Sequence, residues 1–146
     1  MSTLRWIAPL AVALVLAACL PAAPPVTLLG EADAEAYAAE VDQIVEDTLQ
    51  AINDGDYEAH IQHLDETMRA ATTEDAFAGL VDLLMERVGP YRSRTLDRVY
   101  DQGDFRVVIY NAEFERDTVT VRVVFWKDDL ERGISGLWFD SPKLRG

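Results

Sequence analysis

The hydrophobic pattern of this chain changes its period once, at Gly89-Pro90, and this change constrains the fold more than any other feature. Before it, apolar residues recur every three or four positions, as on one face of a helix. After it, apolar and polar residues alternate, as in a β-strand. Because helices that precede strands are typical of an α+β domain, we expect N-terminal helices packed on one face of an antiparallel sheet.

The part of the chain before Gly89 predicts three helices. The first covers residues 31–53 and ends at the turn residues Asn53–Gly55. The second covers about residues 56–66, and the third runs from about residue 73 to residue 88. The part after Pro90 predicts strands rich in β-branched and aromatic residues, at 91–100, 105–116, 118–127 and 133–140. The connections between these strands are short, so the strands are expected to pair as antiparallel hairpins.

The N-terminal segment has the layout of a secretory signal. Arg5 precedes an apolar run over residues 7–16, and small residues follow it. The apolar stretch Trp6–Leu20 has 15 residues, fewer than the roughly 20 that a membrane-spanning helix needs. The residues Leu16-Ala17-Ala18-Cys19 resemble the lipobox of bacterial lipoproteins, in which the cysteine receives a diacylglyceryl group and becomes the first residue. An ordinary secretory signal with an incidental cysteine is the alternative.

The lipobox resemblance implies a division of the chain and a location. Residues 1–18 become a signal peptide, residues 19–30 a lipidated Cys19 with a Pro-rich tether, and residues 31–146 the domain. We expect an extracytoplasmic protein anchored in the cell envelope, since two acyl chains give stable attachment. Leu20 rather than aspartate follows the cysteine, which implies the outer membrane if the organism has two membranes.

The charge balance excludes several classes of function. The chain has 26 acidic and 13 basic residues, so binding to nucleic acid is not expected. Its single cysteine cannot form an internal disulfide or a Cys-rich zinc site. Residues 31–82 carry 15 acidic residues and one basic residue, Arg69, so the helices hold most of the negative charge. That surface is either simply solvated or a face for a cation or a partner.

Two further motifs resemble one family of small domains. Residues 53–67 read NDGDYEAHIQHLDET, Met68 follows, and Gly136–Phe139 read GLWF. These motifs, over about residues 35–140, resemble small NTF2-like domains of the DUF3887 group. The resemblance implies an NTF2-like or cystatin-like cone, in which a curved antiparallel sheet wraps around a long helix. Members of the group occur as lipoproteins, as secreted proteins and as modules that precede α/β-hydrolase domains.

A cone of this kind has a concave apolar mouth, where ligands usually bind. Strand alternation places Tyr110 and Phe114 on one face of their strand, and Phe125 on one face of the next. These side chains are candidates for a ligand pocket, and the alternative is that they form the closed core. Trp126 and Trp138 lie on adjacent predicted strands and form either a docking surface or part of the core.

The only histidines are His60 and His63, spaced so that they lie near one side of a helix. With a nearby carboxylate they would suit acid–base catalysis or a metal, but the His-Glu-x-x-His pattern is absent. Packing or surface roles are the alternative, and we expect no metal and no cofactor. In the first strand, Arg92, Arg94 and Arg98 have even spacing and are expected to share a face, as an anion site or as partners of the acidic helices.

These observations favour a lipid-anchored extracytoplasmic NTF2-like module that binds a partner protein or a small apolar ligand near the membrane, without catalysis. The alternative is a small hydrolase, isomerase or dehydratase that uses His60 and a neighbouring carboxylate in the cone pocket. A third hypothesis is an accessory of envelope assembly or resistance, in which the tryptophan face docks a larger machine. The membrane is the expected partner of the acyl anchor at Cys19.

Overall fold

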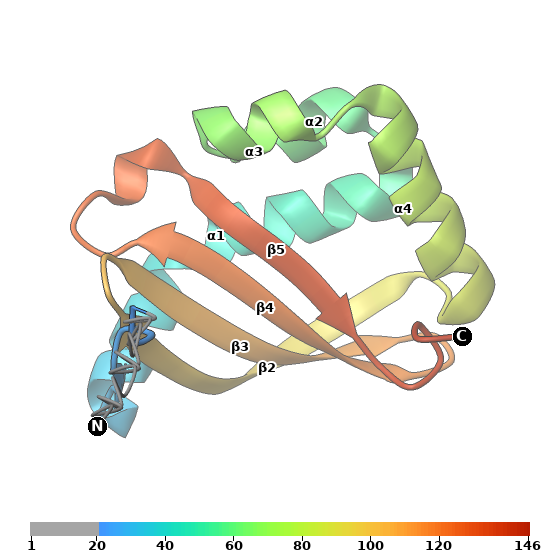
Figure 1. Ribbon diagram of the computed structural model, residues 1–146. Helices are drawn as coiled ribbons and strands as arrows, with labels where there is room; N and C mark the ends of the chain where they lie inside the picture. Colours follow the sequence, from blue (N-terminus) through green and yellow to red (C-terminus); the bar gives the residue numbers. More distant parts are fainter. Residues whose placement is uncertain (1–20) are drawn as a thin grey trace, which may run out of the picture.

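The computed structural model describes residues 21–146, so the predicted signal peptide 1–18 and Cys19 lie outside the described residues. Figure 1 shows the elements in the order β1 (Val26–Leu28), α1 (Glu31–Asp54), α2 (Tyr57–Ile61), α3 (Glu66–Ala71), α4 (Glu74–Arg87), β2 (Tyr91–Gln102), β3 (Phe105–Phe114), β4 (Thr118–Trp126), the 3₁₀ helix η1 (Leu130–Arg132) and β5 (Ile134–Asp140). Among the helices of this part of the chain, none combines the length and apolar character that crossing a bilayer requires.

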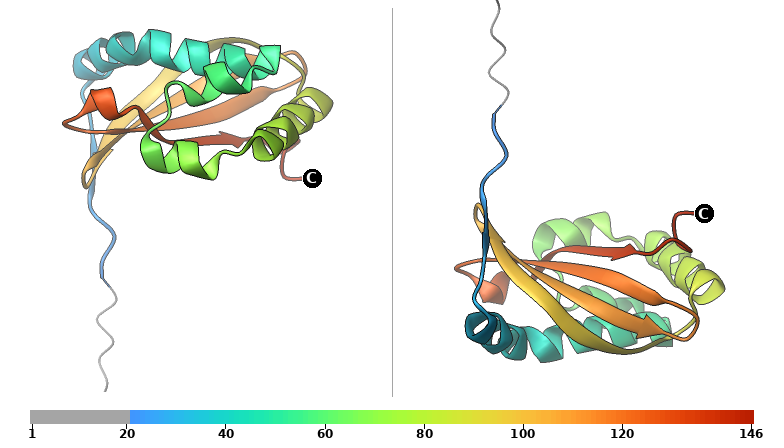
Figure 2. Two further views of the ribbon diagram at one scale, coloured as in Figure 1. Left: turned by 90° about the horizontal axis from the view of Figure 1, so that it is seen from above. Right: turned by 90° about the horizontal axis from the view of Figure 1, so that it is seen from below.

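The five strands of the described residues form one antiparallel sheet in the order β1-β2-β3-β4-β5. The sheet is curved, and the helices cover one of its faces (Figure 2). We call this covered side the inner face and the opposite side the outer face. The predicted α+β class is confirmed, and the arrangement is consistent with an NTF2-like cone.

Helix α1 forms because its apolar residues recur on one face, and that face is buried against the inner side of the sheet. Val41, Val45 and Leu49 are fully buried. The helix ends where Gly55 adopts the left-handed region at φ 64°, as glycine does at many helix C-termini. The predicted first and third helices agree with α1 and α4 to within one or two residues.

The predicted second helix, 56–66, is wrong as a single element. The structure has α2 at Tyr57–Ile61, a break, and α3 at Glu66–Ala71. The break lets the chain pair with the start of β5. The N–H of Ile134 donates to the carbonyl oxygen of His63 at 2.8 Å, and the N–H of Asp65 donates to that of Ile134 at 2.8 Å. The Asp65 carboxylate then starts α3 by accepting from the N–H of Met68 at 2.8 Å.

The expected tether also contains regular structure. Within residues 19–30, Val26–Leu28 form β1, which pairs with the end of β2. The two β-branched residues, Val26 and Thr27, favour an extended backbone. The next N–H, of Leu29, donates to the carbonyl oxygen of Val99 at 3.0 Å. Long-range pairing of this kind leaves no local signal in the sequence.

The expectation that Arg92, Arg94 and Arg98 share one face is wrong, because β2 has two register irregularities. Arg94 lies on the inner face and forms ion pairs with Asp42, at 2.5 Å, and with Glu46 of α1. Arg98 pairs across from Ile109 on the outer face. The predicted pairing of strand arginines with the acidic helices is therefore confirmed at Arg94.

Candidate functional site

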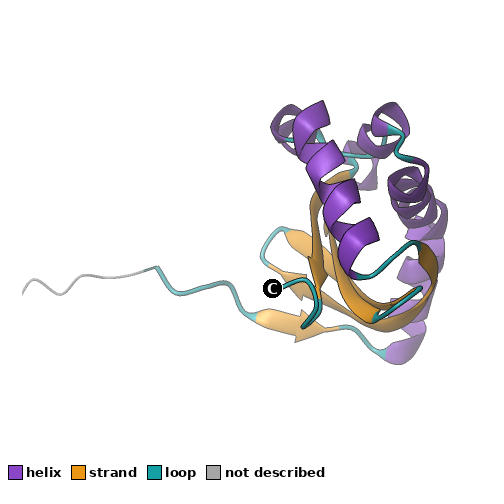
Figure 3. Cartoon of the chain, turned by 90° about the vertical axis from the view of Figure 1, so that its right-hand side faces the viewer, coloured by secondary structure: helices purple, strands orange, loops and turns teal. Residues whose placement is uncertain are grey.

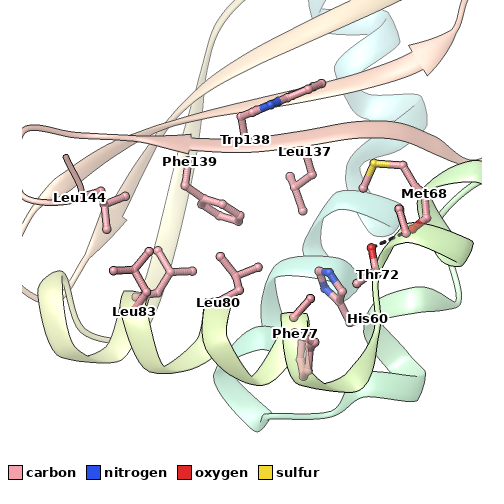
Figure 4. Close-up of a pocket in the computed structure, with 13 residues that line it drawn as sticks. His60, Met68, Thr72, Phe77, Leu80, Leu83, Leu137, Trp138, Phe139 and Leu144 are labelled. Carbon is pink, nitrogen blue, oxygen red and sulfur yellow. Dashed lines mark hydrogen bonds between the residues drawn. The ribbon is translucent and has the colours of Figure 1, made fainter. Parts of the chain in front are cut away.

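A cleft of about 370 Å³ separates α4 from β5, one of the two edge strands of the sheet. We call the side of β5 that faces away from β4 the free edge. We call the cleft the α4–β5 cleft, and Figure 4 shows side chains from both elements pointing into it. Its apolar walls include Phe77, Leu80, Leu83, Leu137, Phe139 and Leu144. Thr73 begins α4 by accepting from the N–H of Ala76 at 3.2 Å. Phe77 and Leu84 bury one side of α4, while Leu83 stays 40% exposed at the rim.

The cleft has few polar groups that a ligand could use. The Thr72 hydroxyl donates to the carbonyl oxygen of Met68 at 2.8 Å and is thus already engaged. His60 and Trp138 are the other side chains in the wall that carry an N–H donor. An apolar cleft of this size falls within the range of small ligand sites, about 300–1,000 Å³. It is suited to hold aliphatic or aromatic groups.

The backbone of β5 supplies polar groups at the border of the cleft. The N–H and C=O of Ile134 point away from β4, since they bond to the segment around Leu64. Along a strand, residues whose side chains lie on one face direct these backbone groups to one edge. Leu137 and Phe139 share the inner face with Ile134, so their backbone groups also point to the free edge. Within residues 21–146, no element pairs with that edge at Leu137 or Phe139.

His60 lies at the inner end of the cleft and is only 2% exposed. Its Nδ1 lies 3.2 Å from the carbonyl oxygen of Thr48 on α1, and its ring stacks on Phe77 at a centroid distance of 4.8 Å. Burial lowers the pKa of His60, although the hydrogen bond to Thr48 opposes this shift. The imidazole is therefore neutral near pH 7, with Nδ1–H donating to the carbonyl. Among residues 21–146, no carboxylate hydrogen-bonds to His60.

The buried His60 predicts a loss of stability in mild acid. Because folding lowers the pKa of His60 below its usual value of 6.5, the unfolded chain binds more protons as the pH falls through 6.5. The free energy of unfolding then decreases, by at most about 1.4 kcal/mol for each unit by which the pKa of His60 in the folded protein lies below that in the unfolded chain. Urea unfolding at pH 7 and pH 5 should show a larger decrease for the wild type than for His60→Gln, which does not titrate. Equal decreases in the two chains would contradict this explanation.

His63 lies apart from the cleft. Its Nε2 is 3.3 Å from the Asp47 carboxylate of α1, on the surface of the domain. The two histidines thus face different surroundings despite their close spacing. The described part of the chain holds no group of three or more His, Cys, Asp or Glu side chains that would suit a metal ion.

Tyr110, Phe114 and Phe125 belong to the core between the sheet and the helices. Phe125 is fully buried, and its ring meets that of Tyr37 at 6.2 Å. Tyr110 packs beneath the Arg94 guanidinium at 5.1 Å. Of the two alternatives for these side chains, the structure favours the closed core.

The two tryptophans occupy different environments. Trp126 is half-buried, and its Nε1–H donates to the Asp65 carboxylate at 3.2 Å. Burial disfavours the charged form of Asp65, but the hydrogen bonds from Met68, Ser135 and Trp126 outweigh it and lower the pKa of Asp65. Trp138 is 51% exposed on the outer face and also borders the α4–β5 cleft. Trp126 thus joins α3 to the sheet, whereas Trp138 remains available for contacts.

Comparison with known proteins gives one match. Residues 45–137 match the family model DUF3887, whose description is a protein of unknown function. A search of curated proteins and a search of solved structures each found no match. The matched region runs from the middle of α1 to β5 and includes both walls of the cleft except Trp138 and the residues after it.

Proposed function

Since the chain belongs to the DUF3887 family, which is described as a protein of unknown function, we propose its function from the α4–β5 cleft. The protein is a lipid-anchored extracytoplasmic module that binds an extended apolar segment of a partner protein near the membrane. The bound segment adds as a strand to β5 and places alternate side chains in the cleft. The observation that carries this proposal is the apolar cleft bordered by backbone groups of Leu137 and Phe139 that have no partner within residues 21–146.

Strand addition satisfies both halves of the site at once. An extended peptide supplies N–H and C=O groups to the edge of a sheet, and its alternate side chains enter neighbouring pockets. The edge of β5 provides the backbone partners for such a peptide. The wall of Leu80, Leu83 and Phe139 provides the pocket for its side chains. A small apolar ligand would fill the cleft but would leave the polar edge of β5 without partners. The edge therefore favours a peptide over the small ligand.

Amide hydrogen exchange tests the proposal directly. The probe is a short peptide that alternates leucine and threonine and carries terminal lysines, which suit the acidic surface of the domain. In the free protein the N–H groups of Leu137 and Phe139 should exchange quickly, and the peptide should slow them. The N–H groups of Trp138 and Asp140 point toward β4 and should be protected with or without peptide.

Two matched leucine variants control this experiment. Leu83→Asp places a charge at the rim of the cleft and should abolish peptide binding. Leu28→Asp makes the same change at an exposed site on β1 and should leave binding unchanged. If decanoate, a small apolar probe, binds the cleft while the peptide fails to protect Leu137 and Phe139, the small-ligand alternative replaces strand addition.

Anchoring at Cys19 is part of the same proposal. The leader and the lipobox-like residues support it, and so does the entry of the chain into the domain through β1 at Val26. An enzyme of the hydrolase, isomerase or dehydratase kind has less support. His60 contacts a backbone carbonyl instead of the carboxylate that such a site requires.

A further inference from the structure

We infer that the outer face of the sheet lies against the membrane, so that the domain has a fixed orientation on the bilayer. The inference rests on the proposed anchor at Cys19. The contact surface consists of Val26, Leu28, Phe105 and Trp138 with the guanidinium of Arg122, and we call it the outer patch. Its occupant is the phospholipid surface in which the anchor is inserted.

The outer patch gathers most of the exposed large apolar side chains. Val26 is 59% exposed, Leu28 64% and Trp138 51%, while Leu83 at the cleft is the fourth such residue in the described part of the chain. Val26 and Leu28 pair across from Gln102 and Tyr100, whose neighbours on β3 are Phe105 and Val107. This register places the exposed residues of β1 on the outer face together with Phe105.

The chain leaves the domain beside this patch. Pro24 borders a hollow of about 290 Å³ together with Phe105, Arg122 and Trp138. Figure 3 shows the loop that precedes β1, residues 21–25, extending from the sheet on the side away from the helices. Fully extended, residues 20–25 span at most about 20 Å between Cys19 and β1. A link this short keeps the outer patch close to the headgroups.

The arrangement of charge favours the same orientation. Residues 31–82, which form α1–α3 and part of α4, carry 15 acidic residues and one basic residue. An anionic membrane repels this layer and turns it toward solvent. Arg122, on the outer face, forms no ion pair within residues 21–146 and stacks on the Trp138 ring at 4.7 Å. It is available to a lipid phosphate, a strong acceptor for guanidinium groups.

The Trp138 ring is held in a defined place on this surface. It lies over Gly136, where a Cβ atom would overlap the ring. The absence of a side chain at Gly136 thus leaves room for the indole, which lines the same hollow as Val124. Tryptophan is enriched at membrane interfaces because its ring is apolar and its N–H is polar. An indole fixed in this way meets the headgroup region with little further loss of conformational entropy.

Fluorescence quenching tests the orientation. The lipidated chain is reconstituted into vesicles of phosphatidylcholine and phosphatidylglycerol with brominated acyl chains. The mature chain contains two tryptophans, Trp126 and Trp138, because Trp6 lies in the predicted signal peptide. Brominated lipid should quench the wild-type emission, and Trp138→Phe should reduce that quenching, because Trp138 is 51% exposed whereas Trp126 is half-buried. Leu28→Asp should weaken it, whereas Leu83→Asp should leave it unchanged.

The outcomes separate the orientation from the anchor. If the acylated chain floats with the vesicles but its emission is not quenched, the orientation is wrong and the anchor stands. The orientation is also wrong if the wild type and Trp138→Phe are quenched equally. If the chain carries no acyl group and does not float, the anchor and the orientation both fail. Protection of Trp138 by a soluble protein or glycan, without quenching by lipid, would assign the patch to that partner instead.

Discussion

A chain with serine in place of Cys19 is expected to lose its acyl groups and its stable attachment to the membrane. Only the cysteine thiol can form the thioether bond to diacylglycerol that a lipobox implies, and the chain has no other cysteine. Two acyl chains give stable attachment to a membrane, whereas one chain gives only marginal binding. Removal of both chains should therefore weaken membrane binding by orders of magnitude. Metabolic labelling with a fatty acid, followed by mass measurement of the purified chain, is the appropriate measurement.

The control for this experiment is Ala22→Ser, which introduces the same residue three positions later and keeps the thiol. It should be labelled like the wild type. Labelling is a better readout than sedimentation, because an uncleaved leader with an apolar stretch of 15 residues can itself retain the chain at the membrane. Acyl label on the Cys19→Ser chain would show that the anchor lies elsewhere.

Replacement of Phe125 by alanine is expected to lower the free energy of unfolding by about 3–5 kcal/mol. The side chain is fully buried between β4 and the helices, and it meets the ring of Tyr37 at 6.2 Å. Removing it costs the transfer free energy of the ring and leaves a cavity in the core, into which the surroundings relax only partially. Urea or thermal unfolding measures the loss, and many domains of this size have only about 5–15 kcal/mol in total.

Phe139→Ala is the informative comparison, because Phe139 borders the α4–β5 cleft and is only partly buried. It should cost less stability than Phe125→Ala and should weaken peptide binding, while Phe125→Ala leaves binding intact under conditions where the domain is folded. If Phe125→Ala instead abolishes binding with little loss of stability, Phe125 belongs to the ligand site and not to the core.

Local patterns are enough to predict most of the fold. The face of α1, the Gly55 terminus and the alternation in β3 and β4 each arise from neighbours in sequence, and each prediction is confirmed. The break between α2 and α3 has a distant cause, because the backbone around Leu64 pairs with Ile134, and its one local signal is Asp65, which caps the start of α3. The strand β1 escapes prediction for the same reason, and register irregularities change the faces of the β2 arginines.

The candidate site is less predictable than the fold. His60 and Trp138 are candidates from the sequence and do border the cleft, but Tyr110, Phe114 and Phe125 are buried in the core. The cleft exists because α4 and the edge strand β5 do not pack closely against each other. The hydrophobic period of a sequence does not predict the distance between two such elements. The one available signal is Leu83, an apolar residue of α4 outside the stripe that packs on the core.

The position of β1 has a consequence for how far the domain can reach. This strand has three residues and pairs with β2 alone, so it is among the elements that open most easily by local unfolding. Under the proposed anchoring at Cys19, with β1 paired, residues 20–25 separate the anchor from the domain and span at most about 20 Å. With β1 released, the link extends through Gly30, and its maximum span rises to about 40 Å. If the chain is anchored at Cys19 as proposed, the pairing of this short edge strand with β2 thus sets the largest distance between the domain and the bilayer.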